Sequence, residues 1–456
     1  MQAGLVFRYV KWQHRELRIL NRLAYLSLMK RLLFLVLLLP LLSAAQPRTD
    51  TLLRILLLKS NNRYLRLAAA NPDSFRVQII YTQINRDRKN RPSFRNYYFN
   101  VDPNLYFNPA SMVKMPLAFL ALEKLNKLEV RDLNKYTAME FDSSWTGQRA
   151  LIRDTTSIDG KASIAHFIKR AFLISENDPY NRLYQFLGQG PINRSFKAKG
   201  YPNSRITRMF MGFDEEGNRH TNAIRFFDHK GKTVYTQPAA YNSEPFDFPR
   251  SIFLGRAHMN SKDELIPGPF DFTKHNNLPL EDLQQMLQSV LFPESVPKRK
   301  RFEISEDDER FLYRYLSQYP SETPVPKYDA DAFYDSYVKF FFRDSTKKMP
   351  PGVRVFNKVG WSYGFLTDVS YVADFNNNIE YMLSATIYVN SDGVINDGKY
   401  DYETMGHPFL HALGQQIYRY ELGRHRDHRP NLDRFRIDYE KRDPKDTRPV
   451  VKEVDN

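Results

Sequence analysis

The sequence contains no cysteine among its 456 residues. Disulfide bonds, thiol nucleophiles, cysteine-based zinc sites and lipid attachment through an N-terminal cysteine are therefore excluded. Any nucleophile must be Ser, Thr, Lys, Asp or Glu, and a metal would need His and carboxylates. With 42% hydrophobic and 26% charged residues, the composition is that of a globular protein. Whole-chain disorder, collagen and a long coiled coil are excluded as well.

The sequence also lacks an apolar run long enough for a membrane span. The run at residues 32–42 has 11 residues, whereas a span needs about 20. It follows Lys30 and Arg31 and precedes small residues, an order that predicts a signal peptide at residues 29–45 and an exported protein, periplasmic or extracellular. Because the basic residues follow Met29, we expect residues 1–28 to be an over-extended N-terminus. An uncleaved N-terminal anchor is the alternative; after signal cleavage we expect no stable membrane span.

A long block of basic residues is missing too, although the formal net charge is +15. Residues 1–45 hold seven of the 67 basic residues and one of the 52 acidic ones, so the remaining chain carries about +9 with both signs mixed. This pattern favours a solvated surface over a nucleic-acid footprint, and we expect no nucleic-acid partner. Residues 422–456 contain 18 charged residues out of 35, which predicts an exposed, charged C-terminal tail.

Hydrophobic periodicity places strands near both ends of the chain and helices between them. Strands are predicted at residues 76–84, 94–101, 353–359, 367–375 and 381–389. Helices are predicted at residues 51–58, 108–127, 163–173, 179–188, 280–291, 305–316 and 409–421. A surface hairpin is predicted within residues 224–236. This order predicts an α+β domain whose sheet is built from both chain ends.

A Ser-x-x-Lys motif, Ser111 to Lys114, opens the apolar helix predicted at residues 108–127. Residues three apart on a helix share one face, so the lysine amine is expected beside the serine hydroxyl. A serine needs a neighbouring base to become nucleophilic, and a lysine in an apolar site has a lowered pKa and serves as that base. Other matches include residues 295–298, 336–339 and 345–348. The first match is distinguished by its helix N-terminus and by two motifs that follow it.

The second motif, Ser175-Glu176-Asn177, lies in a break between two predicted helices. A hydroxyl and an amide at this place are suited to shuttling a proton and holding a substrate amide, whereas helix capping is the alternative interpretation. The third motif, Lys358-Val359-Gly360, lies on the strand predicted from residue 353. A strand edge with an ammonium and a glycine is suited to docking an extended acyl substrate, with Lys358 attracting its carboxylate.

In this order, the three motifs resemble those of the serine penicillin-recognising enzymes, which include class A β-lactamases and DD-peptidases with Ser-x-x-Lys, Ser-Asp-Asn and Lys-Thr-Gly motifs. Residues 108–127 are especially similar to the nucleophile helix of the class A branch, and the resemblance spans about residues 75–421. It implies an α+β fold with an antiparallel β-sheet flanked by helices, plus an all-helical lobe, and an active site between them. It also implies a serine hydrolase without a cofactor or a metal.

The resemblance implies a role for each matched residue. Ser111 would be acylated by a small-molecule β-lactam or a cell-wall acyl-D-Ala peptide after activation by Lys114, and Ser175 would pass the proton to the leaving nitrogen. The implied substrate-binding residues are Asn177, Lys358, Gly360 and Trp361. The backbone N–H groups of Ser111 and Trp361 would form the oxyanion hole, worth about 3–4 kcal/mol per donor.

The sequence lacks the E-x-x-L-N segment that class A β-lactamases carry downstream of the second motif for deacylation. The corresponding region is residues 213–218. Its candidate deacylation carboxylates are Asp214, Glu215 and Glu216. An acidic turn closed by Gly217 is the alternative interpretation. Glu176 also replaces the Asp of the second motif, and Val359 replaces the Thr of the third.

These observations predict one enlarged domain at residues 46–421 with insertions near residues 219–278 and 319–352. We expect an exported serine hydrolase that acylates on Ser111 and hydrolyses the amide of a β-lactam ring, an activity that confers antibiotic resistance. A DD-peptidase, or a non-hydrolysing penicillin-binding or cell-wall sensor protein with slow or absent deacylation, is the alternative.

Residues 360–364 also match G-x-S-x-G, the nucleophile elbow of α/β-hydrolases. This match makes Ser362 a minor alternative nucleophile, with Asp374 and His407 in the order that a triad requires. An elbow needs a helix directly after the serine, whereas residues 365–375 alternate like a strand. The periodicity therefore disfavours the elbow.

Overall fold

A computed structural model describes residues 29, 47–210, 213–443 and 445–454. The chain divides into two units, Met1–Pro47 and Arg48–Asn456, and the description below concerns the second. Apart from Met29, the predicted signal peptide and the leader before it lie outside the described residues. Within the described part of the chain, no helix has the length and apolar character needed to cross a membrane.

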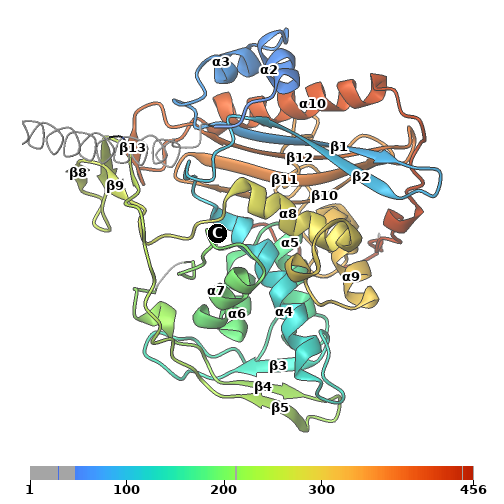
Figure 1. Ribbon diagram of the computed structural model, residues 1–456. Coiled ribbons are helices and arrows are strands. Elements are labelled where there is room, and N and C mark those ends of the chain that lie inside the picture. The colour runs from blue at the N-terminus through green and yellow to red at the C-terminus, as the bar shows by residue number, and fades with distance from the viewer. Residues whose placement is uncertain (1–28, 30–46, 211–212, 444, 455–456) are drawn as a thin grey trace, which may run out of the picture. The chain divides into compact units, whose positions relative to one another are not determined.

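The centre of the second unit is a five-stranded antiparallel sheet in the order β10-β11-β12-β1-β2 (Figure 1). Its strands are β1 (Gln78–Arg86), β2 (Pro92–Phe99), β10 (Val353–Ser362), β11 (Phe365–Asp374) and β12 (Ile379–Tyr388). β1 pairs with β12, so the sheet joins the two ends of the chain as predicted. Every residue of β11 is buried, because helices cover both faces of the sheet, whereas the edge strand β2 is partly exposed.

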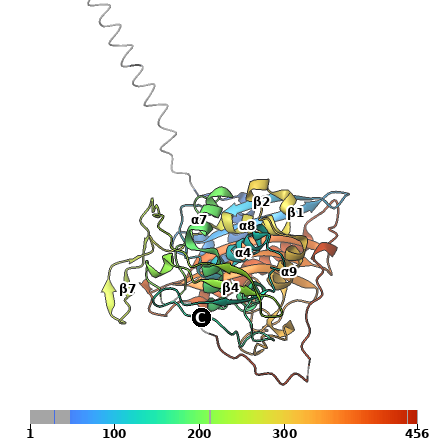
Figure 2. The same cartoon turned by 90° about the horizontal axis from the view of Figure 1, so that it is seen from below.

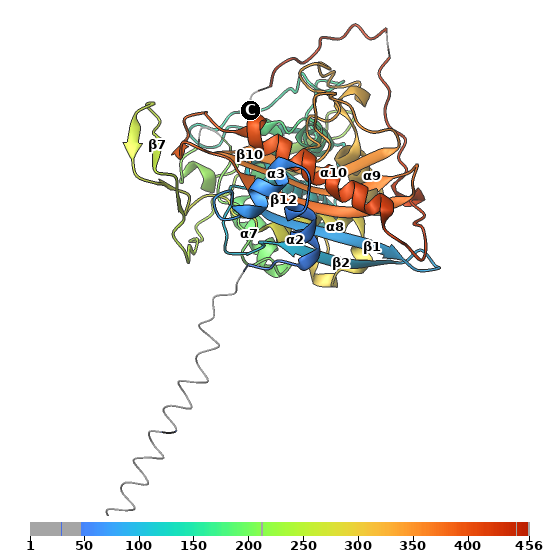
Figure 3. The same ribbon diagram turned by 90° about the horizontal axis from the view of Figure 1, so that it is seen from above.

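One face of the sheet is covered by the chain's outer helices. α10 (His407–Gly423) packs on β12 and against α3 (Arg63–Ala70), and α2 (Thr51–Leu58) packs on α3 and β2. Figure 3, viewed from above, shows these three helices over the sheet. The other face is covered by α8 (Leu280–Leu291), whose apolar side packs on β11, β12 and β1. This arrangement explains why the central strands are buried on both faces.

A helical lobe lies beyond α8. It contains α4 (Lys114–Leu128), α5 (Ile164–Leu173), α6 (Asn177–Leu187), α7 (Gln189–Ala198) and α9 (Glu306–Ser317). α4 is buried nearly all round, because α5, α6 and α8 pack around it. Ser163 caps α5 by accepting the N–H of His166. The predicted α+β fold, an antiparallel sheet flanked by helices together with a helical lobe, is confirmed.

Shorter strands form three additional sheets. β3 (Ala138–Phe141), β4 (Ile224–Phe227) and β5 (Thr233–Gln237) make one sheet, and β4 with β5 is the hairpin predicted from the sequence. The others consist of β6 (Phe253–Leu254) with β9 (Phe270–Asp271), and of β7 (Ala257–Met259), β8 (Leu265–Pro267) and β13 (Val394–Ile395). Figure 2 shows β7 at one side of this unit. Residues 251–272 of the predicted insertion therefore carry structure of their own.

The C-terminal segment is charged as predicted, but the prediction that it is exposed is wrong for several of its residues. Leu432 and Phe435 are 3% and 1% exposed and belong to the main apolar core. Val451 pairs with Tyr328 in a parallel bridge, and Glu440 forms a 2.9 Å ion pair with Lys169 of α5. Widely spaced apolar residues thus anchor a segment whose composition alone indicates a solvated tail.

Candidate active site

Ser111 lies in a short 3-10 turn, η2 (Ala110–Val113), immediately before α4. The predicted helix thus begins as a tighter turn, and the α-helix itself starts at Lys114. The side chain of Asn108 accepts the N–H of Ala110 at 2.8 Å and the hydroxyl of Ser362 at 3.1 Å. Ala110 has φ 44°, a left-handed conformation that costs energy for a non-glycine residue. The nucleophile position is therefore held in a strained, hydrogen-bonded turn.

Lys114 is fully buried beside Ser111. Its Nζ lies 2.7 Å from the Ser111 Oγ, 2.7 Å from the Asn177 Oδ1 and 3.3 Å from the Ser175 Oγ, and it donates to the Ser175 carbonyl. Burial, together with the nearby ammonium of Lys358, lowers the pKa of Lys114 well below its ordinary value. A neutral amine 2.7 Å from a serine hydroxyl is placed to take its proton.

The second motif joins α5 to α6. Ser175 is 2% exposed and has φ 69°, which turns the chain sharply between the two helices. α6 begins at Asn177, two residues before the predicted start at Pro179, so the amide of Asn177 projects from the first turn of the helix. The structure therefore brings Ser175 and Asn177 to the same lysine amine as Ser111.

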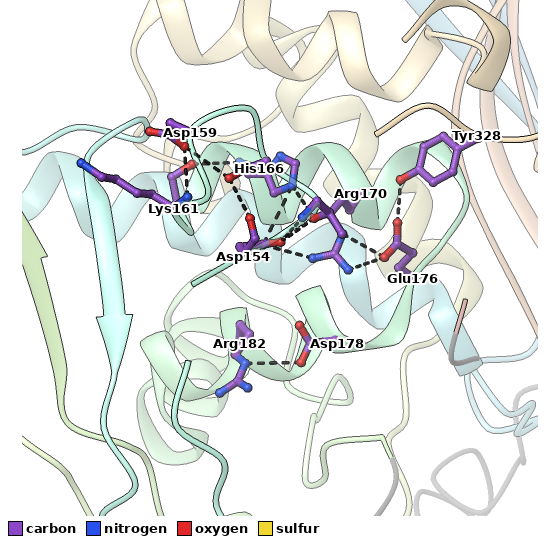
Figure 4. A network of polar contacts seen from close by, with 12 residues as sticks. Asp154, Asp159, Lys161, His166, Arg170, Glu176, Asp178, Arg182 and Tyr328 are labelled. Atoms are coloured by element: carbon purple, nitrogen blue, oxygen red, sulfur yellow. Dashed lines mark hydrogen bonds and ion pairs between the residues drawn. The ribbon is translucent and has the colours of Figure 1, made fainter. Parts of the chain in front are cut away.

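Glu176, the residue that departs from the family motif, is held by a buried network behind the site (Figure 4). Its carboxylate accepts from the guanidinium of Arg170 and from the hydroxyl of Tyr328 at 2.6 Å. Arg170 also contacts Asp154, which lies beside His166. Because buried carboxylates need such partners, Glu176 fixes the loop between α5 and α6.

Lys358 is buried on β10, and its amine contacts Ser175 from the interior of the protein. Its Nζ donates to the Ser175 Oγ and to the Val359 carbonyl, each at 2.8 Å. Burial lowers the pKa of Lys358 to about 7, although Asp368 partly opposes this shift. The two lysines therefore lie on either side of the Ser175 hydroxyl, which is positioned to relay a proton.

Gly360 lets β10 approach the nucleophile turn. A Cβ at this position would lie 2.5 Å from the Pro109 carbonyl oxygen and 3.0 Å from the backbone nitrogen of Met112. Real Cβ atoms essentially never come this close to backbone atoms, so a side chain here would push β10 away from Ser111. The glycine of the third motif is thus required by geometry.

A cavity of about 560 Å³ opens above these residues. Of the predicted site residues, Ser111, Ser175, Asn177 and Trp361 line it. Lys114, Lys358 and Gly360 lie behind this wall. Sequence reasoning missed other lining residues, among them Arg208, Phe210, His275, Asn276, Tyr363 and Tyr400. His275 and Asn276 lie in the insertion predicted near residues 219–278, and no motif in the sequence marked them as cavity residues.

The candidate deacylation carboxylates do not line this cavity. Asp214 accepts the N–H of Gly217 at 2.7 Å, Glu215 pairs with Lys274 at 2.7 Å, and Glu216 lies 3.3 Å from His220. Each acid has a partner within its own turn or at the surface. None of the described lining residues is Asp or Glu, so the assignment of Asp214, Glu215 or Glu216 as the deacylation carboxylate stays a prediction that the cavity lining does not support.

Phe210 occupies the wall next to Lys114. The centre of its ring lies 5.2 Å from the Lys114 Nζ, and its backbone N–H and C=O are bonded to the side chain of Asn181 on α6, each at 2.8 Å. Further along, the buried side chain of Asn218 closes the turn by bonding Met209 and Asp214. An aromatic ring is therefore held beside the amine of Lys114.

The structure disfavours Ser362 as an elbow nucleophile. β10 ends at Ser362, Tyr363 and Gly364 form the turn with positive φ, and β11 begins at Phe365. A β-hairpin thus stands where the elbow needs a helix. Asp374 accepts hydrogen bonds from Tyr418 and from the side chain of Asn377, each at 2.7 Å, and the ring of His407 packs against Phe340 instead.

Solved structures similar to this chain include several β-lactamases and the protein PBP-A. A β-lactamase from Xanthomonas campestris pv. campestris has 11% identity and a TM-score of 0.44, covering 80% of this chain and 98% of its own. A β-lactamase from Francisella tularensis has 12% identity and a TM-score of 0.44, covering 78% and 98%. The structure titled PBP-A has 12% identity and a TM-score of 0.42, covering 82% and 98%.

No curated protein matches the chain. A family model does match, over the segment that carries the first two motifs. Residues 63–242 match the beta-lactamase enzyme family, and the resemblance to β-lactamase-like serine hydrolases that the motifs indicated is thereby confirmed.

Proposed function

We propose that the protein transfers the acyl group of a β-lactam or an acyl-D-Ala peptide to Ser111. The observation that carries this proposal is the arrangement around Lys114, whose amine contacts the Ser111 hydroxyl, the Ser175 loop and the Asn177 amide at the edge of a cavity. The beta-lactamase family match over residues 63–242 supports it.

In the proposed reaction, Lys114 accepts the proton of Ser111 as the Oγ attacks the amide carbonyl and a bond forms between them. The oxyanion is stabilised by the backbone N–H groups of Ser111 and Trp361. Ser175, hydrogen-bonded to Lys358, passes a proton from Lys114 to the leaving nitrogen as the C–N bond breaks. An acyl-enzyme and a free amine result, or a ring-opened adduct when the substrate is a β-lactam.

Hydrolysis of this adduct needs a base for the incoming water. Phe210 stands beside Lys114, and no carboxylate is among the described residues that line the cavity. This observation favours the second candidate function, a penicillin-binding protein or DD-peptidase that releases β-lactam adducts slowly, over an efficient β-lactamase.

A chromogenic cephalosporin tests both levels of the proposal. We expect a burst of one equivalent of chromophore per protein, and an intact-mass adduct that proteolysis places on Ser111. Continuous turnover without an accumulating adduct would instead identify a β-lactamase. The absence of burst, turnover and adduct from a folded sample would overturn acyl transfer itself.

We also propose that the protein is exported, on the basis of the signal-like segment at residues 29–45. Expression of the whole chain in a bacterial host, followed by fractionation and N-terminal sequencing, tests this proposal. The expected N-terminus lies near Gln46 in the exported fraction, whereas an unprocessed chain confined to the cytoplasm would contradict it.

A further inference from the structure

Arg208 carries the one formally charged side chain in the described lining of the Ser111 cavity. Arg208 also lines a neighbouring pocket together with Asp214, Glu215 and Asp271, but no carboxylate among the described residues forms an ion pair with its guanidinium. Lys114 and Lys358, in contrast, lie behind the wall with their amines bonded to protein oxygens. A guanidinium in the wall of a cavity that forms no ion pair with a carboxylate of the protein is suited to bind an anionic group of a ligand.

Several contacts hold Arg208 in place. Its Nη1 donates to the Nε2 of His275 at 2.9 Å, its backbone N–H donates to the Asn276 side chain at 3.2 Å, and its carbonyl accepts the Tyr180 hydroxyl at 2.7 Å. Burial lowers the pKa of His275 to about 3, with a further lowering by Arg208, so the imidazole is neutral and accepts through Nε2. The guanidinium is thus oriented without being neutralised.

The position of Arg208 indicates which part of a substrate it meets. Its carbonyl is tied to Tyr180 on α6, the helix whose first residue, Asn177, is the predicted partner of the substrate's side-chain amide. Phe210, two residues on, is tied to the same helix through Asn181. Arg208 is thus tied through its backbone to the helix that begins with Asn177, so the acyl group is the part of the substrate that we expect it to meet.

We propose that Arg208, oriented by His275, forms an anion subsite for a carboxylate on the acyl group of the substrate. The preferred substrate is then dianionic, with one carboxylate next to the leaving nitrogen and a second one on the acyl side chain. This inference rests on the proposed function, because it deepens the substrate class of the same site.

Two penicillins test the subsite: benzylpenicillin, and its analogue with one additional carboxylate on the side chain. We expect the wild-type protein to be acylated about tenfold faster by the dicarboxylate, as measured by second-order rate constants from intact mass. Arg208→Gln should abolish this preference by slowing acylation by the dicarboxylate more than acylation by benzylpenicillin, while Arg208→Lys should keep part of it. Lys274→Gln, which removes a neighbouring exposed cation, is the matched control and should leave the ratio unchanged.

Equilibrium binding to the Ser111→Ala variant separates this inference from the proposed function, because it does not require acylation. Calorimetry should show tighter binding of the dicarboxylate, and a Ser111→Ala/Arg208→Gln variant with a wild-type circular dichroism spectrum should lose that difference. If the wild type is not acylated but the binding difference depends on Arg208, the proposed function fails and the subsite stands. Equal binding of both penicillins, or an equal loss for both in the Arg208 variants, would overturn the subsite.

Discussion

Two of the chain's Ser-x-x-Lys motifs, Ser111–Lys114 and Ser336–Lys339, have fully buried lysines, and their surroundings differ. The Lys114 Nζ lies 2.7 Å from its serine hydroxyl at the edge of a cavity. The Ser336 hydroxyl, in contrast, is buried without a hydrogen-bond partner among the described residues. The Nζ of Lys339 instead donates to Leu316 O, Val355 O and Asn357 Oδ1.

The pKa does not distinguish the two lysines. Burial lowers the pKa of Lys339 to about 7, and burial also lowers that of Lys114. The difference lies in what each amine contacts: Lys114 contacts a hydroxyl that lines a cavity, whereas Lys339 crosslinks the backbones of α9 and β10. A lysine with a lowered pKa is thus a candidate base where its amine contacts a hydroxyl that a substrate can reach. Where the amine contacts only backbone and amide oxygens, the lysine is a structural crosslink.

The largest expected effect is the difference in acylation rate between the variants of the two serines. Ser111→Ala should reduce acylation by a chromogenic cephalosporin at least about 10³-fold, because the attacking oxygen is removed. Ser336→Ala is the matched control and should leave the burst within twofold of wild type. Labelling with a fluorescent penicillin, followed by intact mass, checks both variants. Labelling that survives in Ser111→Ala and disappears in Ser336→Ala would reverse the assignment.

The two lysine variants should differ in activity in the same way as the two serine variants. Lys114→Met is expected to slow acylation by about 10²–10⁴-fold, the usual contribution of a general base. Lys339→Met should keep the acylation rate within about threefold but lower the free energy of unfolding by about 1–3 kcal/mol, because it leaves buried acceptors unpaired. Burst kinetics and urea denaturation measure the two effects. A slow but fully stable Lys339→Met protein would contradict the structural role.

Phe210, in the wall next to Lys114, offers a smaller test. Phe210→Glu should place a carboxylate near the amine and accelerate release of the acyl adduct by about tenfold to hundredfold. Phe210→Gln, of similar size but uncharged, is the control. Decay of the intact-mass adduct after removal of free β-lactam gives the rates. Equal decay in both variants would show that the missing carboxylate is not what limits deacylation.

The smallest effect concerns pH. Acylation should slow as pH falls through the lowered pKa of Lys114, because the protonated amine no longer accepts the serine proton. The Lys358 ammonium contributes to that lowering, so Lys358→Met should raise the pKa and move the acid limb of the rate profile upwards by about 0.5–1 unit. An acid limb that does not move, or that moves downwards, would show that the lysines are not coupled.

Strong periodicity made much of the fold predictable. The helices expected at residues 51–58 and 280–291 coincide with α2 and α8, and all five strands of the central sheet were predicted to within a few residues. β3 was missed because four residues carry too little periodic signal, and α7 because Gly190 and Pro191 in its first turn read as a break. Short elements of this kind depend on tertiary contacts.

The site was predictable where its residues lie in motifs and unpredictable where they meet through long-range contacts. Ser111 and Lys114 lie three residues apart where a 3-10 turn runs into α4, so their spacing alone predicts that their side chains meet. Phe210 reaches Lys114 because Asn181 binds its backbone from α6, a contact between segments with no common period. The acids near Asp214 suggested a base by composition, yet each finds a nearer partner in the folded chain.

The C-terminal bridge has a practical consequence for handling the protein. Val451 pairs with Tyr328, whose hydroxyl holds Glu176 next to Ser175, so Val451 is two contacts away from the proton relay. A purification tag or fusion partner attached after residue 456 would disturb the pairing of Val451 with Tyr328. Preparations that carry such a tag are expected to report slower acylation than the same protein after the tag has been cleaved off.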